Sequence, residues 1–294
     1  MDEETKQLWL KLLNTKKSVH AIDIKQKLKL EPLKAISCML LKVPSLFFKN
    51  GIKVKIKTFW GGNMIAIFPD GISSYIAMNE FFEEGLTRML IEYLKEGMTF
   101  IDIGAHIGYF SLLASDIVGS QGQVHSFEPT SSIFSVLKEN AQSRKNIVVN
   151  NTAVFSRTME LEFKNFGLRY SAFNSFATPK LNKIAKYENI KVNAITLDEY
   201  VEKNKITPNF VKIDAENAEF DILKGMEKTI NRYMPIISLE VGVEIPGIVS
   251  SHDCVSHLIK KGYLPVCYEN GKIKKHEIKD EYEYDNIVFL PNNK

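Results

Sequence analysis

The sequence has few cysteines and no long apolar run, and both absences narrow the class of protein. Its three cysteines, Cys38, Cys254 and Cys267, lie far apart in a chain of 294 residues, so they indicate neither a disulfide framework nor a thiolate metal site. No apolar run reaches the roughly 18 residues typical of a membrane span, and the acidic residues 2–4 are atypical of a secretory signal. We therefore expect a cytoplasmic protein.

Arginine is absent from the first 60 residues, although this segment is basic. It contains 13 lysines against 5 acidic residues, whereas the remainder has 25 basic and 30 acidic residues. Apolar residues at helical spacing predict two or three helices within residues 3–49. Residues 33–48, with Lys34, Lys42 and Lys49, could lie on a membrane surface or contact a biosynthetic partner. A helix packed on the rest of the protein is the commoner explanation.

The predicted elements divide the chain into three parts. A composition of 45% apolar and 25% charged residues is that of a globular protein. Residues 1–50 form a helical N-terminal extension. Residues 51–78 form a β-hairpin and a linker, because residues 52–57 alternate strictly between apolar residues and lysine. Residues 79–294 form the main domain.

The main domain alternates strands with helices. Strands are predicted at 99–103, 123–127, 147–154, 210–213, 236–241 and 286–290, and helices at 79–97, 107–118, 131–143, 197–204, 218–232 and 250–261. This order predicts an α/β fold, a mostly parallel sheet with helices on both faces. Residues 159–194 interrupt the alternation with a strand at 159–163 and an irregular segment, and such insertions commonly shape a substrate site.

A hydrophobic strand followed by a glycine turn and an apolar helix spans residues 100–118. This arrangement brings backbone N–H groups and a helix N-terminus against a cofactor. A dinucleotide site would need a glycine at the position of His106, between Gly104 and Gly108. A nicotinamide cofactor is therefore disfavoured. At the end of the next strand, Glu128 can accept hydrogen bonds from a ribose diol, and the two features together favour an adenosyl cofactor.

Several ordered segments resemble the FkbM-type methyltransferases. They are residues 99–110 (TFIDIGAHIGYF), 127–129 (FEP), 152–154 (TAV), 196–199 (TLDE), 211–219 (VKIDAENAE) and 223–225 (LKG). The resemblance runs from about Phe82 to Phe289. It implies a Rossmann-like class I methyltransferase fold with a seven-stranded sheet and S-adenosylmethionine as cofactor. It also implies methyl transfer to oxygen, often on a sugar or natural product.

The resemblance also implies a set of cofactor-binding residues. Asp102, Gly104 and Gly108 would line the methionine end, Glu128 the ribose, and Thr152 and Ala153 the adenine. Glu83 and Thr87 would approach the amino acid part of the cofactor, and Ala105, His106, Tyr109 and Asp214 belong to the same site. Family members usually have Asn at the position of His106 and Gly at that of Asn217. A glycine at the latter position suggests a turn with positive φ, which Asn can also adopt.

Asp214 is the first candidate for the catalytic base, because it follows an apolar strand and reaches the carboxyl edge of the sheet beside the cofactor. His106 and Glu216 are further candidates. Family members have Asn in place of His106, so a polar packing role is the stronger hypothesis for that histidine. Glu216, Glu219 and Glu240 lie near Asp214 in the sequence-based arrangement and could bind Mg²⁺. No metal is expected, since Glu219 can instead interact with the start of its own helix.

The irregular segment supplies candidates for acceptor binding. Tyr170, Phe173, Asn174 and Ser175 mix aromatic faces with hydrogen-bonding groups, as sugar-binding surfaces do, and Glu240 would lie at the edge beside them. Aromatic residues that merely cover the core would give the same pattern. His252 and His257 fall on a C-terminal helix and are interpreted as surface or packing residues, although one facing the cleft could serve as base.

Two other functions stay open. A nucleic-acid methyltransferase would use the lysine-rich segment to contact phosphates. The sequence has neither the Asn/Asp-Pro-Pro-Tyr segment of base amino methyltransferases nor the Pro-Cys of cytosine methyltransferases, so nucleic acid is not the expected partner. A non-catalytic cofactor-binding module is the second alternative, and the presence of Asp102, Glu128 and Asp214 argues against it. A small molecule or a glycan is the expected acceptor.

Overall fold

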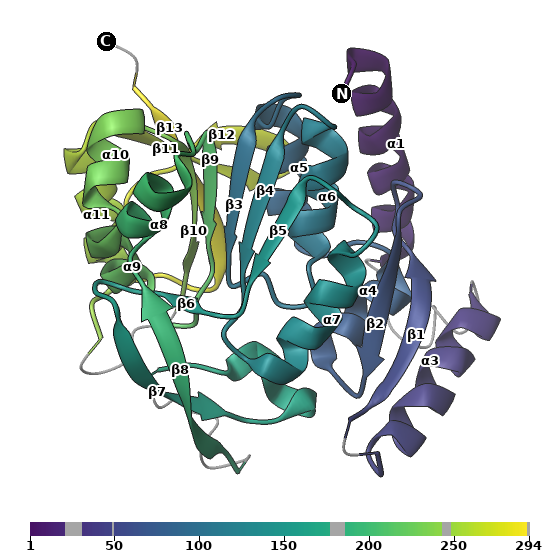
Figure 1. Ribbon diagram of the computed structural model, residues 1–294. Helices are drawn as coiled ribbons and strands as arrows, with labels where there is room; N and C mark the ends of the chain where they lie inside the picture. The colour runs from purple at the N-terminus through teal and green to yellow at the C-terminus, as the bar shows by residue number, and fades with distance from the viewer. Residues whose placement is uncertain (21–30, 49, 177–185, 243–247, 293–294) are drawn as a thin grey trace.

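A large sheet organises the protein, and a hairpin and a smaller sheet lie beside it. The computed structural model describes residues 1–20, 31–48, 50–176, 186–242 and 248–292 (Figure 1). The large sheet contains β3 (Thr99–Ile103), β4 (Gln123–Phe127), β5 (Ile147–Asn150), β9 (Phe210–Ile213), β10 (Ile236–Val241), β11 (Tyr263–Glu269), β12 (Lys272–Lys275) and β13 (Asp285–Pro291). The hairpin pairs β1 (Ile52–Lys57) with β2 (Asn63–Phe68). The smaller sheet contains β6 (Ala153–Val154), β7 (Met159–Asn165) and β8 (Glu188–Ile195).

Helices precede, connect and cover these strands. They are α1 (Glu3–His20), α3 (Pro32–Ser45), α4 (Gly71–Asn79), α5 (Glu84–Tyr93), α6 (Tyr109–Val118), α7 (Ser131–Ala141), α8 (Leu197–Asn204), α9 (Glu219–Gly225), α10 (Glu227–Tyr233) and α11 (Ser251–Lys260), with a short 3-10 helix, η1 (Leu168–Phe173).

The large sheet has the order β12-β11-β13-β10-β9-β3-β4-β5, with β13 and β12 antiparallel to their neighbours. The strands β5, β4, β3, β9 and β10 are parallel. Their carboxyl ends therefore meet at one edge, and the order reverses between β3 and β9. Ligands bind at such a switch point in open α/β sheets.

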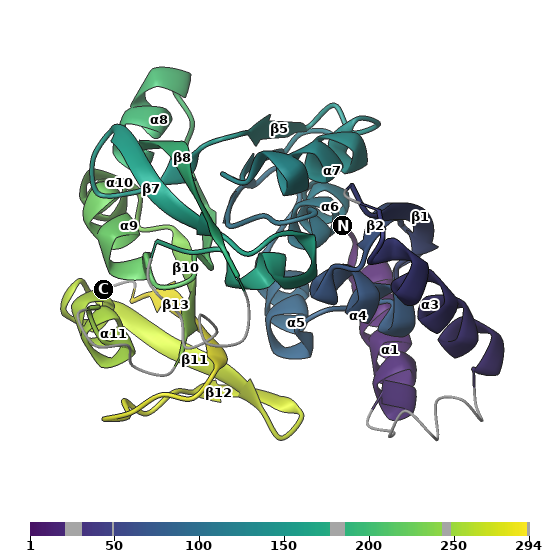
Figure 2. The same cartoon turned by 90° about the horizontal axis from the view of Figure 1, so that it is seen from below.

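Alternate residues of the central strands bury opposite faces of the sheet. Phe100 and Phe210 belong to one apolar core, which includes residues of α1, α5, α6 and α7. Ile101 and Val211 belong to the other, with residues of α8, α9, α10 and α11. Figures 1 and 2 show these two groups of helices on opposite sides of the sheet. The α/β fold with helices on both faces is confirmed.

The structure differs from the sequence-based expectation in several elements. The six strands located from the sequence belong to this sheet, and β11 and β12, which were not located, bring it to eight strands instead of the expected seven. The single strand expected at 147–154 divides into β5 and β6, which belong to different sheets. The expected helix at 218–232 is two helices, α9 and α10, and the expected helix at 79–97 is shorter because Glu80 and Glu83 adopt positive φ before α5 begins. The hairpin at 52–68 forms as expected.

The N-terminal helices pack against the main domain in two different ways. Leu13 of α1 is fully buried and belongs to the same core as Phe100. Helix α3 packs on α4 and β2 and leaves much of its apolar surface exposed. Among the described residues, no helix is both long and apolar enough to span a membrane.

Candidate functional site

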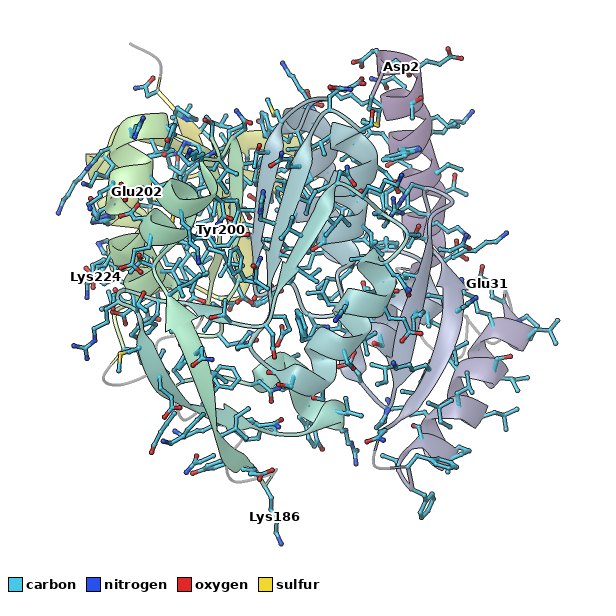
Figure 3. All side chains as sticks on the ribbon, viewed as in Figure 1. Asp2, Glu31, Lys186, Tyr200, Glu202 and Lys224 are labelled. Atoms are coloured by element: carbon cyan, nitrogen blue, oxygen red, sulfur yellow. The ribbon has the colours of Figure 1, made fainter. Side chains whose placement is uncertain are left out.

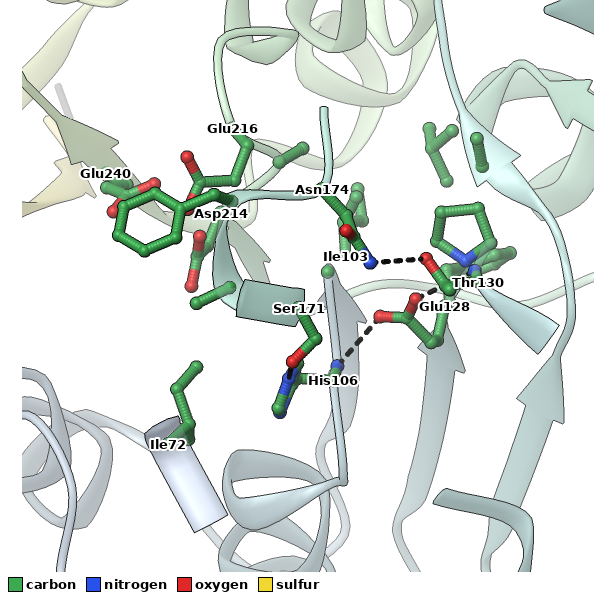
Figure 4. Close-up of a pocket in the computed structure, with 18 of the residues that line it drawn as sticks. Ile72, Ile103, His106, Glu128, Thr130, Ser171, Asn174, Asp214, Glu216 and Glu240 are labelled. Atoms are coloured by element: carbon green, nitrogen blue, oxygen red, sulfur yellow. Dashed lines mark hydrogen bonds between the residues drawn. The ribbon is translucent and has the colours of Figure 1, made fainter. Parts of the chain in front are cut away.

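A cavity of about 400 Å³ lies at the carboxyl edge of the sheet, between the ends of β3, β4, β9 and β10 and the segment that contains η1. Figure 4 shows Asp214, Glu216 and Glu240 on one side of it, with Glu128 and Thr130 on the other. The cavity thus combines a chain turn, a strand-end carboxylate and a group of acidic side chains in one space.

The turn after β3 lets two strand ends approach closely. Gly104 has φ +75°, and a Cβ atom there would lie 1.7 Å from the backbone oxygen of Asp214. A residue other than glycine would therefore force β3 and β9 apart at this edge. Gly108, with φ +93°, precedes the first turn of α6. The local geometry has the strand–turn–helix form that the sequence indicated.

Glu128 ends β4 as a buried carboxylate. Its Oε1 accepts from the N–H of Thr130 at 2.8 Å, and its Oε2 accepts from the N–H of His106 at 3.2 Å. Burial raises the pKa of Glu128, although the charge of His106 and these hydrogen bonds oppose the change. Each carboxylate oxygen can accept a further hydrogen bond, and Glu128 lines the cavity. The residue therefore fits the role of a ribose-diol acceptor.

Asp214, Glu216 and Glu240 form an acidic cluster. One carboxylate oxygen from each lies within 4.8 Å of those of the other two. Burial and the charge of Asp214 raise the pKa values of Glu216 and Glu240 well above their usual range. The cluster therefore binds a proton more readily than isolated carboxylates do. Oxygen ligands at these distances could also hold a divalent cation.

Glu83 and Tyr284 extend this cluster. The Tyr284 hydroxyl donates to Glu83 Oε1. Burial, with the charge of Asp214, raises the pKa of Glu83 to about 7. Tyr284 comes from the loop before β13 and was not anticipated from the sequence.

Lys212 is the cation that balances the site, and sequence reasoning missed its role. Its Nζ lies 3.1 Å from Asp214 Oδ2, 3.4 Å from Asp102 Oδ1 and 3.2 Å from the backbone oxygen of Gly104. Burial alone would lower the pKa of Lys212. The negative charges of Asp214 and Asp102 have a larger, opposite effect, so the pKa is raised overall. A lysine within the apolar strand 210–213 was the available signal, because a buried charge needs partners.

His106 lines the cavity, and its imidazole ring contacts Ser171 and Asp70. Its Nε2 lies 2.9 Å from Ser171 Oγ and 3.5 Å from Asp70 Oδ1, while Nδ1 is buried without a hydrogen-bond partner. Burial lowers the pKa of His106, but the charge of Asp70 and its hydrogen bond outweigh that effect, so the pKa is raised. His106 also has φ 50°, a left-handed conformation that Asn adopts more easily.

The segment around η1 closes one side of the cavity. Phe173 and Asn174 line it, as expected for acceptor binding, and so do Ser171 and Ala172, which were not anticipated. Asn174 donates to Thr130 Oγ1 at 3.3 Å and accepts from the N–H of Phe166. Tyr170 and Ser175 do not line the cavity; Ser175 is fully buried beside β7, where its backbone pairs with that of Lys164. Residues 177–185 of the expected substrate segment lie outside the described residues.

The expected cofactor residues fall into two groups. Glu83, Gly104, His106, Glu128, Thr152, Ala153 and Asp214 line the cavity, whereas Thr87, Asp102, Ala105, Gly108 and Tyr109 do not. Members of the second group contact one another or neighbouring buried residues. Thr87 hydrogen-bonds Tyr109, and Asp102 accepts a hydrogen bond from Ser111 and lies 3.4 Å from Lys212 Nζ.

The structure also places Glu219, Asn217, His252 and His257. Glu219 Oε1 accepts from the N–H groups of Ala215 and Asn217, so it stabilises the turn before α9 as the alternative explanation held. Asn217 has the expected positive φ, 78°. His252 contacts the backbone of Lys279, and His257 lies 2.9 Å from Glu227. Neither histidine lines the cavity.

Comparison with known sequences gives two matches. Residues 102–264 match the methyltransferase FkbM domain, which is more than half of the chain. A hexuronic acid methyltransferase, AglP, from Haloferax volcanii is 26% identical over 165 residues. That alignment covers 55% of this chain and 64% of the relative, less than two thirds of its length.

Solved structures with a similar arrangement are more distant. The FkbM methyltransferase of Methylobacillus flagellatus is 12% identical with a TM-score of 0.43, over 74% of this chain and 52% of that one. The Aeropyrum pernix fibrillarin, solved with S-adenosylmethionine, is 12% identical with a TM-score of 0.42, over 67% and 68% of the two chains. Likeness at this level identifies neither a substrate nor catalytic residues.

Proposed function

The chain belongs to the FkbM methyltransferase family, whose cofactor is S-adenosylmethionine, and on that premise we propose that the methyl acceptor is a hydroxyl group of a sugar or glycan. The supporting observation is the cavity itself, which joins the Gly104 turn and Glu128 to the acidic cluster around Asp214. The first part suits the cofactor, and the second suits proton removal from an alcohol.

Different residues of the cavity are assigned to different parts of the cofactor. We assign Glu128 to the ribose hydroxyls, Thr152 and Ala153 to the adenine, and the turn at Gly104 to the amino acid end. When bound, the cofactor supplies an electrophilic methyl carbon on a sulfonium centre. Displacement at such a carbon needs in-line alignment of the acceptor oxygen, which the protein must provide.

Asp214 is the proposed base. Its carboxylate is held by Lys212 at 3.1 Å and still has about a fifth of its side chain exposed, so an acceptor hydroxyl can reach it. Asp214 Oδ would accept the proton of the acceptor hydroxyl when that oxygen displaces the sulfonium sulfur from the methyl carbon. Glu216 and Glu240 can share that proton, because their pKa values are raised. His106 then has a positioning role, tied to Ser171 and Asp70.

The charge of the cavity favours a hydroxyl over a carboxylate as acceptor. A hexuronic acid, the acceptor class in the name of the Haloferax relative, offers both kinds of oxygen. The acidic cluster repels an acceptor carboxylate, whereas a neutral hydroxyl needs the base that the cluster provides. We therefore expect a methyl ether as product.

Radiolabelled S-adenosylmethionine, with glucuronides, galacturonides and neutral hexosides as acceptors, tests the proposal. We expect transfer of label to a product that alkali does not hydrolyse, and loss of transfer in Asp214→Asn. Label released by mild alkali would identify a methyl ester and refute the hydroxyl assignment. Cofactor binding without transfer to any acceptor would support the non-catalytic alternative.

Calorimetry tests the cofactor site separately. S-adenosylmethionine and its demethylated product should bind, NAD should not, and Glu128→Ala should weaken both sulfur ligands. Equal affinity of Glu128→Ala and the parent protein would remove the ribose assignment and leave the acceptor question untouched.

A further inference from the structure

Helix α3 exposes a row of large apolar side chains, whereas an amphipathic helix of a globular protein usually buries its apolar face. It packs on the protein through Ala35, Cys38 and Ser45, which are small and buried. Leu41 is half-buried against the same surface, whereas other large apolar residues are exposed, with Leu33 exposed by 82%, Leu40 by 67% and Val43 by 62%. The helix therefore packs on the rest of the protein, as the commoner explanation holds, but does so mainly through its small side chains.

The exposed residues form a stripe along one side of the helix. Leu33, Ile36, Leu40, Val43 and Phe47 follow one another at intervals of three or four residues, which places them on one helical face. Phe47, in the turn after the helix, is 85% exposed, and Phe48 beside it is 58% exposed. Soluble proteins rarely leave a continuous apolar surface of this kind without a partner.

The charge around the stripe identifies the partner. Residues 32–48 contain Lys34 and Lys42 and no acidic residue. Lys55 and Lys57 are exposed on the neighbouring strand β1. Lys34 is partly neutralised by Glu80. An apolar stripe with a basic surround matches an anionic lipid surface.

A second copy of the chain fits this surface less well. A symmetric dimer would place the same patch against itself, so the lysines of one copy would face those of the other. Like charges at close range oppose that contact. A bilayer with acidic headgroups instead presents complementary charge outside an apolar interior.

We propose that residues 33–48 dock the protein peripherally on membranes that contain anionic lipids, with Leu33, Ile36, Leu40, Val43 and Phe47 entering the interface. Helix α3 rests on α4, and α4 contacts η1, which lines the cavity. The docked surface is thus linked through two packed elements to the site. This arrangement suits an acceptor carried at a membrane surface. The docking does not depend on the acceptor being a sugar.

Co-sedimentation with vesicles tests the docking. The full-length protein should bind vesicles of phosphatidylcholine with about 30 mol% phosphatidylglycerol and bind pure phosphatidylcholine much more weakly. The double variant Leu40→Glu/Phe47→Glu should lose binding by about tenfold or more, because two charges would enter the interface. Val148→Glu, at an exposed apolar residue of β5, is the matched control and should bind like the parent. Salt should weaken binding.

Two results would overturn the proposal. One is equal vesicle binding by the double variant and the parent, or no binding by either. The other is a dimer in solution that the double variant converts to monomer while vesicle binding is absent, which would assign the stripe to a second copy. Unchanged affinity for S-adenosylmethionine in the double variant would show that it is folded, so a loss of vesicle binding reports on the surface itself.

Discussion

At the scale of single residues, the site depends on one buried cation. Lys212 is 1% exposed and lies between Asp102 and Asp214. It therefore performs two tasks: it neutralises Asp102, which is fully buried, and it holds the carboxylate that we assign as base. Removing one partner of a buried ion pair leaves the other charge without compensation, and that cost exceeds the value of the pair itself.

Lys212→Met should lower the free energy of unfolding by about 3–5 kcal/mol, because Asp102 and Asp214 would lose their cation. Urea unfolding measures the change. Lys224→Met is the matched control, since Lys224 projects outward from α9 (Figure 3) and its side chain is 52% exposed; we expect a change below about 1 kcal/mol. Similar losses in the two variants would contradict the special position of Lys212.

Asp214→Asn should separate chemistry from cofactor binding. We expect kcat to fall by about 10²–10⁴-fold, as for loss of a general base, while the affinity for S-adenosylmethionine stays within a few fold. His106→Asn introduces the residue that family members usually have and should retain most of the activity. If His106→Asn lost as much kcat as Asp214→Asn, the assignment of the base would move to the histidine.

Glu219 should make stability depend on pH. Burial raises its pKa to about 7, although backbone hydrogen bonds from Ala215 and Asn217 oppose the change. An acid with a raised folded-state pKa binds more protons folded than unfolded, so its contribution is complete below about pH 4.5 and is lost as pH rises through 7. Glu219→Gln keeps the oxygen acceptor and removes the titration.

The Glu219→Gln protein should therefore gain stability over the parent as pH rises from 5 to 8, by about 1 kcal/mol or more at the upper end. Urea unfolding at several pH values gives the difference directly. A difference that is constant with pH would show that Glu219 has an ordinary pKa in the folded protein.

At the scale of elements, the sequence predicted what is locally encoded. The strands at 99–103 and 210–213 are mostly apolar, interrupted by Asp102 and Lys212, and Gly104 marks the turn after the first of them. Buried parallel strands and tight turns leave such signals in a sequence. Strand β11 is mostly apolar but contains Pro265, which is unusual inside a sheet. The edge strand β12 is three lysines and one isoleucine, so it carries no apolar pattern, and such an edge strand is decided by its neighbour in the sheet.

The contacts that form one wall of the cavity could not be predicted from the sequence either, because they join residues far apart in the chain. Asp70, at the N-cap of α4, accepts from the N–H of Ser73 and also contacts Ser171 and His106. Ser171 lies 101 residues away along the chain. No local pattern encodes a contact of this range. Thus Asp214 and Glu128 could be identified at strand ends, whereas Asp70, Ser171 and Tyr284 required the folded chain.

Asp70→Asn should lower the pKa of His106. Burial lowers that pKa, and the charge of Asp70 is the largest influence that raises it, so the neutral amide leaves burial dominant. Asn remains a good N-cap residue, and we expect α4 to persist with a stability loss of about 1–2 kcal/mol from the weaker hydrogen bonds. NMR titration of the histidine ring protons measures the shift, with the other five histidines as internal controls. An unchanged His106 would mean that Asp70 does not control its protonation.

At the scale of the whole molecule, the described part of the N-terminal extension contains helices α1 and α3, which pack differently. Helix α1 is part of the catalytic domain's core, since Leu13 is fully buried there and Trp9 lies 6.3 Å from Trp60 between ring centres. Helix α3 presents its apolar residues outward. A domain boundary at residue 50 therefore does not correspond to a boundary in packing, because α1 shares the core of the residues that follow it.

Leu13→Ala should destabilise the entire protein by about 2–5 kcal/mol, because it leaves a cavity in the shared core. Leu33→Ala, on the exposed side of α3, should change stability by less than about 0.5 kcal/mol. Trp9 and Trp60 are the only tryptophans, so fluorescence reports directly on the docking of α1. Unfolding followed by fluorescence and by far-ultraviolet circular dichroism should coincide in both variants. An early fluorescence transition in Leu13→Ala, with the rest of the fold intact, would show instead that α1 is a dispensable appendage.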